Sequence, residues 1–175
     1  MNDSKARAEE AKKRLYRWKD LLRDIPLSEK RLEGMQQRLD SLGSQSIGDG
    51  LPKATGFKQD KLSGLVTAKV DLENEIKRKK ALVQSELEQI KLIISNMPDA
   101  EERYVLLSRY VDCNDWKIII SGFYDVPVSY GEEFDKMARA VYRKHGSALI
   151  SFSHAEEQLR QCGVSAKPAK RQNAL

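Results

Sequence analysis

Residues 59–96 carry a nearly continuous heptad pattern of apolar side chains. The apolar positions are Leu62, Leu65, Leu72, Ile76, Val83, Ile90 and Ile93, and the pattern is interrupted, without ending, at Lys69, Lys79 and Glu86. As a helix, this segment would be a rod of roughly 55 Å, since each residue adds about 1.5 Å. One helix cannot bury its own apolar stripe, so the rod must pack on other helices of the chain, on a second copy of itself, or on both. The pattern leaves these alternatives open.

The first 42 residues can supply a packing partner within the chain. Residues 3–24 and 28–42 both show apolar side chains at helical spacing, which are Leu15, Trp18, Leu21 and Leu22 in the first segment and Leu32, Met35, Leu39 and Leu42 in the second. Pro26 lacks a backbone donor and disfavours a helical conformation at Ile25. We therefore predict two helices with a break at Pro26.

A glycine-rich stretch, residues 43–58, separates these segments from the heptad pattern. Its composition predicts a flexible connector. The stretch is long enough to reverse the direction of the chain. For residues 1–97 we therefore expect an antiparallel helical hairpin or coiled coil.

Residues 98–153 show the pattern of three shorter helices. The first is expected over residues 101–112 and the second over residues 116–123, while the third begins after Ser129 or Gly131. The predicted fold class is all-α, with the hairpin or coiled coil followed by a trihelical unit of helix-turn-helix type.

The end of the chain has a different character. The sequence after Gly163 has no apolar period and is basic. Residues 154–175 are therefore expected to be a mostly disordered basic tail.

A purely basic segment lies on the third helix of this unit. Every charged side chain from Lys136 to Lys144 is positive, and apolar residues recur at helical spacing, so one face can pack while the basic face points outward. An α-helix fits the major groove of duplex DNA, where Arg and Lys contact guanine edges and phosphates. The candidate DNA-binding residues are Lys136, Arg139, Tyr142, Arg143 and Lys144.

These assignments compete with simpler ones. The net charge of +5 suits nucleic acid but explains solubility equally well, and a cationic helix face can simply be solvated. Lys136, at the start of the helix, suits a phosphate better than a base edge. Tyr142 can stack on a sugar or pack on Trp116. We expect His145 to be a packed or capping residue, and Trp116 to be a core anchor.

Three short motifs, in order, resemble those of a known family. Residues 109–111 (RYV), 115–119 (DWKII) and 139–149 (RAVYRKHGSAL) are similar to the C-terminal signature of ArpU/RinA-like phage transcriptional regulators. That signature is itself similar to region 4 of sigma factors, a helix-turn-helix. Family members also carry a pair of long charged helices before this unit. The resemblance covers the chain up to Phe152.

The resemblance implies a sequence-specific DNA-binding transcriptional regulator of a phage or prophage, which activates late genes for packaging or lysis. It further implies double-stranded DNA and host RNA polymerase as partners, in the cytoplasm of a bacterial cell. A single trihelical unit reads few base pairs, so a homodimer on paired half-sites is expected.

The sequence departs from the family pattern in two places. Residues 121–136 form a longer connection than the short turn of the family, and this insertion would either extend the last helix or form a loop against the DNA. Ile118 and Ile120 replace polar or small residues. The second helix is therefore unusually apolar, and its surface would face the N-terminal helices or a partner.

Other classes of function lack a signature. No nucleophile elbow, phosphate-binding loop or dinucleotide turn occurs, so no enzyme activity, cofactor or small-molecule substrate is expected. Cys113 and Cys162 fit no metal-binding pattern and are expected to be reduced, with no metal site. No apolar run approaches the about 20 residues of a membrane span, and no signal-peptide core begins the chain, which predicts a soluble cytoplasmic protein.

Two other hypotheses stay open. A small terminase subunit, a phage assembly protein, also combines a helix-turn-helix with oligomerising helices, but it would form a large ring that the mass in solution reveals. An RNA-binding or anti-repressor module is the second, and competition between duplex DNA and RNA would separate it from a DNA-binding regulator.

Overall fold

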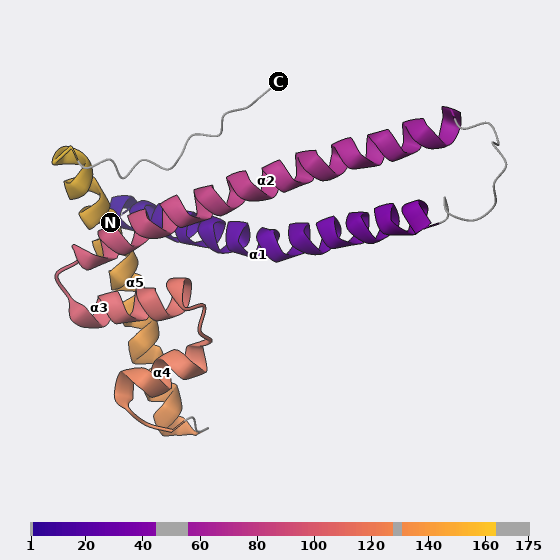
Figure 1. Ribbon diagram of the computed structural model, residues 1–175. Coiled ribbons are helices and arrows are strands. Elements are labelled where there is room, and N and C mark those ends of the chain that lie inside the picture. The colour runs from indigo at the N-terminus through magenta and orange to yellow at the C-terminus, as the bar shows by residue number, and fades with distance from the viewer. Residues whose placement is uncertain (1, 45–55, 128–130, 164–175) are drawn as a thin grey trace. The chain divides into compact units, whose positions relative to one another are not determined.

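The computed structural model describes residues 2–44, 56–127 and 131–163, and every regular element within them is a helix. In chain order these elements are α1 (Asn2–Ser44), α2 (Gly56–Ser95), α3 (Ala100–Leu106), the π-helical η1 (Leu107–Val111), α4 (Trp116–Tyr124) and α5 (Glu132–Gln161) (Figure 1). The predicted all-α class is confirmed. Among the described helices, none combines the length and the apolar character that crossing a membrane requires.

Two compact units divide the chain, and α1 and α2 contribute to both. Unit 1 contains Met1–Lys19 and Gln84–Leu175, and unit 2 contains Asp20–Val83. This division differs from the domain boundary expected at residue 97. The first turns of α1 and the last turns of α2 belong with the C-terminal helices, because they share a core with them.

Unit 2 holds the remaining parts of α1 and α2, which run in opposite directions (Figure 1). Its buried apolar side chains lie on both helices and are Ile25, Leu72, Ile76 and Val83. An ion pair joins the two helices at 2.7 Å between Lys80 and Glu29. Three of the buried residues are heptad positions of the sequence pattern, so that pattern marks a real buried stripe.

The break predicted at Pro26 is wrong, since α1 continues through this residue. Proline removes one hydrogen bond from a helix, but the residues on both sides of Pro26 are held by α2. The ammonium group of Lys79 lies 3.5 Å from Asp24 Oδ2 and 3.5 Å from Ser28 Oγ. These contacts span the proline, and Ile25 beside it is buried.

The connector predicted over residues 43–58 lies mostly outside the described residues. Its ends, residues 43–44 and 56–58, are helical and belong to α1 and α2. The described helices are therefore longer than the periodicity predicted.

The core of unit 1 joins α1 and α2 to the C-terminal helices. Its buried side chains include Leu15 and Trp18 from α1, Ile90 and Ile93 from α2, and Phe152 from α5. Burial of this kind contributes about 1.5–3 kcal/mol for each large apolar side chain.

An ion-pair network borders the same core. Arg14 donates to Glu156 at 2.8 Å and to Gln89 at 3.1 Å, and it lies 3.5 Å from Glu86. Glu86 is buried and was one of the interruptions of the heptad pattern. Its carboxylate is tolerated in the seam because the guanidinium of Arg14 lies beside it.

The disordered tail predicted over residues 154–175 is wrong for its first part, which is helical. Helix α5 continues to Gln161, Ala155 is buried in the core of unit 1, and Glu156 pairs with Arg14. These contacts explain why the helix extends past Phe152. Residues 164–175 lie outside the described part of the chain.

We expect Leu15→Ala to destabilise unit 1 by about 2–5 kcal/mol, because a fully buried leucine is lost from a packed core. Leu27→Ala is the matched control: it makes the same chemical change on the same helix, where the leucine is 68% exposed, and should shift stability by less than about 0.5 kcal/mol. Urea unfolding followed by circular dichroism measures both. Equal effects would contradict the assignment of Leu15 to the core.

Candidate nucleic-acid interface

Two apolar clusters hold α5 against the other helices of unit 1. Near its start, Ala138 and Val141 pack with Val105 of α3 and with Ile119 and Ile120 of α4. Further along, other buried residues of α5 pack in the larger core, namely Ala148, Leu149, Phe152 and Ala155. The apolar face of the helix, predicted from its periodicity, is therefore buried along most of its length.

Helix α4 is short and is bounded by Asp115 before it and Asp125 after it. Asp115 precedes it in an extended conformation, although its side chain makes no capping hydrogen bond. Asp125 ends the helix with a left-handed backbone, φ 52°, and the hydroxyl of Ser121 donates to the carbonyl of Val126. These contacts occupy the first part of the insertion over residues 121–136. Its last part belongs to α5, which starts at Glu132, as predicted for a helix that begins after Gly131.

Three of the five candidate residues form an exposed row on α5. Lys136, Arg139 and Arg143 are all exposed and follow one another at spacings of three and four residues. Residues at these spacings share one side of a helix. That side is opposite the buried face of Ala138 and Val141, because each residue turns the helix by about 100°. We call these three residues the basic row.

The fourth candidate, Lys144, faces α3 instead. Its ammonium group lies 3.0 Å from Asp99 Oδ2 and 2.7 Å from Glu101 Oε2. The hydrogen bond to Glu101 is the main cause that raises the pKa of Lys144, and the bond from Lys144 is the main cause that lowers the pKa of Asp99. Lys144 therefore has two carboxylate partners within its own fold and does not extend the basic row.

The remaining candidate, Tyr142, is 47% exposed and also packs on Trp116. The two rings meet edge to face, with centroids 4.9 Å apart, and the guanidinium of Arg109 lies 4.9 Å from the centroid of the Trp116 ring. Trp116 is only partly buried. It is thus a packing residue at the edge of the smaller cluster, less enclosed than the core anchor that the sequence predicted.

The isoleucines of α4 separate into two environments. Ile120 is buried in the smaller cluster, whereas Ile118 is 53% exposed. Of the two isoleucines that the sequence singled out, Ile118 is the exposed one, and Tyr124 at the end of α4 is 37% exposed.

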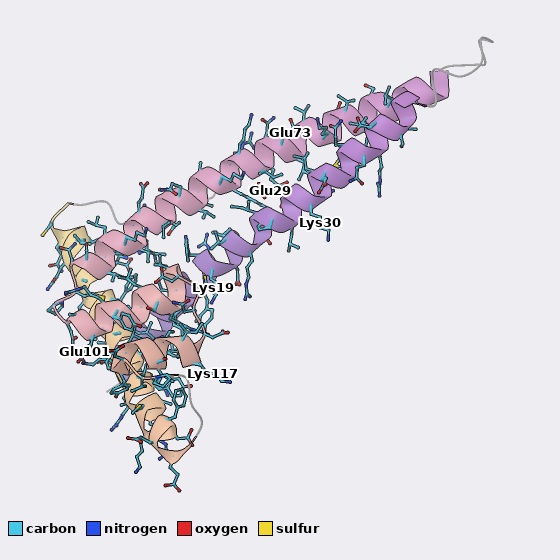
Figure 2. The ribbon with its side chains drawn as sticks, turned by 60° about the horizontal axis from the view of Figure 1, so that its bottom comes forward. Lys19, Glu29, Lys30, Glu73, Glu101 and Lys117 are labelled. Atoms are coloured by element: carbon cyan, nitrogen blue, oxygen red, sulfur yellow. The ribbon has the colours of Figure 1, made fainter. Side chains whose placement is uncertain are left out.

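Carboxylates lie on both sides of the basic row, and the candidate site predicted from the sequence did not include them. Glu132, Glu133 and Asp135 form the first turn of α5, where negative charge stabilises the helix macrodipole. Asp99 and Glu101 lie on the Lys144 side through the start of α3. Figure 2 shows Glu101 at one edge of the C-terminal helices and Lys117 at the other. The positions of α3 acids beside α5 depend on tertiary packing, so no local pattern could reveal them.

His145 lies in a layer of rings beneath this surface. Its Nε2 is 3.1 Å from the hydroxyl of Tyr110, its ring stacks on Tyr110 at 5.9 Å, and it meets the edge of Trp116 at 5.1 Å. Burial is the main cause that lowers the pKa of His145 to about 4, and the charges of Lys12 and Arg109 add to it. This environment fits the packed role that the sequence predicted for His145.

Among the described residues, no group of three or more His, Cys, Asp or Glu side chains is arranged to hold a metal ion. Cys113 and Cys162 are both free thiols. The candidate site of unit 1 consists of the exposed basic row and of Tyr142 beside it.

Comparisons with known proteins found no family model, no curated protein and no solved structure that matches this chain.

Stability should fall between pH 6.5 and about 4 because His145 is held neutral in the fold. The unfolded chain binds a proton at His145 as the pH drops below about 6.5, whereas the folded chain resists it until about pH 4. His145→Gln should reduce this pH dependence, as measured by urea unfolding at pH 7 and pH 5. The control is His154→Gln at an exposed position, which should keep the wild-type difference. An unchanged pH dependence in His145→Gln would contradict the buried neutral imidazole.

Proposed function

We propose that the chain is a DNA-binding protein that inserts the part of α5 from Lys136 to Arg143 into the major groove of duplex DNA. The observation that carries this proposal is the basic row of Lys136, Arg139 and Arg143, which is exposed along the helix side opposite its buried face. A helix of this kind can enter a groove roughly 12 Å wide without losing its packing on the other helices.

The arrangement of α3, α4 and α5 supports the same proposal. Helices α3 and α4 both pack on α5 and cover its apolar face, so they brace it without covering the basic row. In helix-turn-helix proteins the last helix reads bases while the preceding helices brace it and contact the DNA backbone. Arg139 and Arg143 are the candidates for base edges, and Lys136 is the candidate for a phosphate.

The charges around α5 favour one direction of approach. On the Lys144 side, Asp99 and Glu101 would repel phosphates, and they already engage the lysine. On the other side, Tyr142 is exposed and Arg109 lies over Trp116, while the carboxylate of that side, Asp135, lies two turns before Tyr142 at the start of α5. We infer that the DNA backbone runs along the Tyr142 side, where Tyr142 contacts sugar or phosphate.

The biological role follows from the resemblance of residues 139–149 to ArpU/RinA-like regulators. We propose a sequence-specific transcriptional regulator of a phage or prophage that activates late genes, with host RNA polymerase as a further partner. A homodimer on paired half-sites would supply the affinity that one trihelical unit lacks. Sedimentation tests this last point, and a large ring would favour the small terminase alternative.

Replacing Arg139 and Arg143 together by alanine should abolish sequence-specific binding, since each arginine contact to a base is worth about 1–3 kcal/mol. The matched control is Arg160→Ala, an exposed arginine near the other end of the same helix. Fluorescence anisotropy with duplexes selected from random sequence measures the affinity, and circular dichroism checks the fold. If the double variant bound as tightly as the control, α5 would not be the reading helix.

Lys144→Ala should weaken DNA binding far less than Arg143→Ala, although the two residues are adjacent. Lys144 is neutralised by Asp99 and Glu101, whereas Arg143 is exposed. The anisotropy titration measures both variants, and equal losses would contradict the direction of approach inferred above.

The same anisotropy titration of the wild-type chain, repeated with an RNA duplex as competitor, tests the RNA-binding alternative.

A further inference from the structure

Three lysines of unit 1 follow one another on α1 at intervals of seven residues. Lys5, Lys12 and Lys19 share one side of the helix, because seven residues make nearly two turns. The same side carries Tyr16, a residue that is 39% exposed. Lys5 is exposed and Lys12 and Lys19 are partly exposed. We call these three residues the lysine row.

Packed rings connect this side of α1 to the DNA-binding surface proposed for α5. Tyr16 meets Tyr110 edge to face at 5.6 Å, and Tyr110 stacks on His145 at 5.9 Å. From His145 the series continues to Trp116 at 5.1 Å and from there to Tyr142 at 4.9 Å. Both end members, Tyr16 and Tyr142, are exposed. The series lies within unit 1, so it fixes the lysine row and α5 in one body.

The electrostatics agree with this geometry. After burial, the charges of Lys12 and Arg109 are the causes that lower the pKa of His145, so cations from α1 and η1 both lie near α5. Glu9 is on the same side of α1, 3.9 Å from Lys12, and the side chains of Lys12 and Glu9 are 42% and 56% exposed. Such exposed pairs contribute about 0–1 kcal/mol, so a phosphate could replace Glu9 as the partner of Lys12.

We propose that the lysine row is a second contact with duplex DNA, which binds the sugar-phosphate backbone beside the groove that α5 enters. This inference rests on the proposed function. Lysine is a flexible point charge, suited to phosphates and not to a planar recognition of bases. The lysine row would therefore add affinity for any duplex and leave the choice of sequence to Arg139 and Arg143.

The test compares Lys12→Gln and Lys19→Gln, singly and together, with Arg17→Gln as the control. Arg17 is exposed on the same helix but is turned about 100° away from Tyr16. Glutamine keeps the helix propensity while it removes one charge. The affinity of the full chain is measured on its selected duplex and on an unrelated duplex, from 0.05 to 0.5 M salt.

Each lysine variant should lose about fivefold in affinity at 0.15 M salt, equally for both duplexes, because one phosphate contact contributes about −0.9 to the log–log salt slope. The slope should become shallower by about that amount. Arg17→Gln should change the affinity by less than about twofold. If the lysine variants lost no more affinity for the duplexes than Arg17→Gln does, the inference would be overturned.

The failure of the proposed function has a different signature. If the wild-type chain bound no duplex at any salt concentration, both proposals would be wrong. If the wild type bound and the Arg139 and Arg143 double variant did not, while Lys12→Gln and Lys19→Gln matched the control, only the lysine row would be excluded.

Discussion

The burial of one continuous apolar face on α5 is the constraint on which unit 1 depends. That face is covered by α3 and α4 near Val141 and by α1, α2 and η1 near Phe152. Because the face is occupied along most of the helix, the opposite side is the part of α5 left for a partner. The position of Lys136, Arg139 and Arg143 on that side is therefore a consequence of core packing.

Whether a charged side chain of unit 1 is exposed or paired depends more on tertiary contacts than on its neighbours in the sequence. Arg143 and Lys144 are neighbours in the chain, yet one is exposed and the other is bound to Asp99 and Glu101. A helix turns by about 100° between neighbours, which is enough to place them on different sides. The uniform positive sign of residues 136–144 thus overstates the cationic surface that a polyanion can reach.

Sequence periodicity predicted the helical class and the buried side of α5, because both depend on local spacing. It was wrong at Pro26, where α1 continues with Ile25 buried and with Lys79 of α2 in contact with Asp24 and Ser28 on the two sides of the proline. It also ended α5 too early. The last turns of this helix are stabilised by the ion pair of Glu156 with Arg14, a residue far away in the sequence. For the candidate site, the basic row was predictable, but the engagement of Lys144 by α3 was not.

The heptad interruption at Glu86 shows the same dependence on distant residues. A carboxylate in an apolar seam would be costly if it stood alone, since a buried charge without a partner loses its hydration. Here the guanidinium of Arg14 joins Glu86 of α2 to Glu156 of α5, so one cation fixes α1 against two other helices. The four-residue step from Arg14 to Trp18 is one helical turn, so it places the ion pairs directly beside the core that Trp18 enters. The start of α1 is thus positioned by both charge and apolar burial, which is what allows its lysines to form a fixed surface on unit 1.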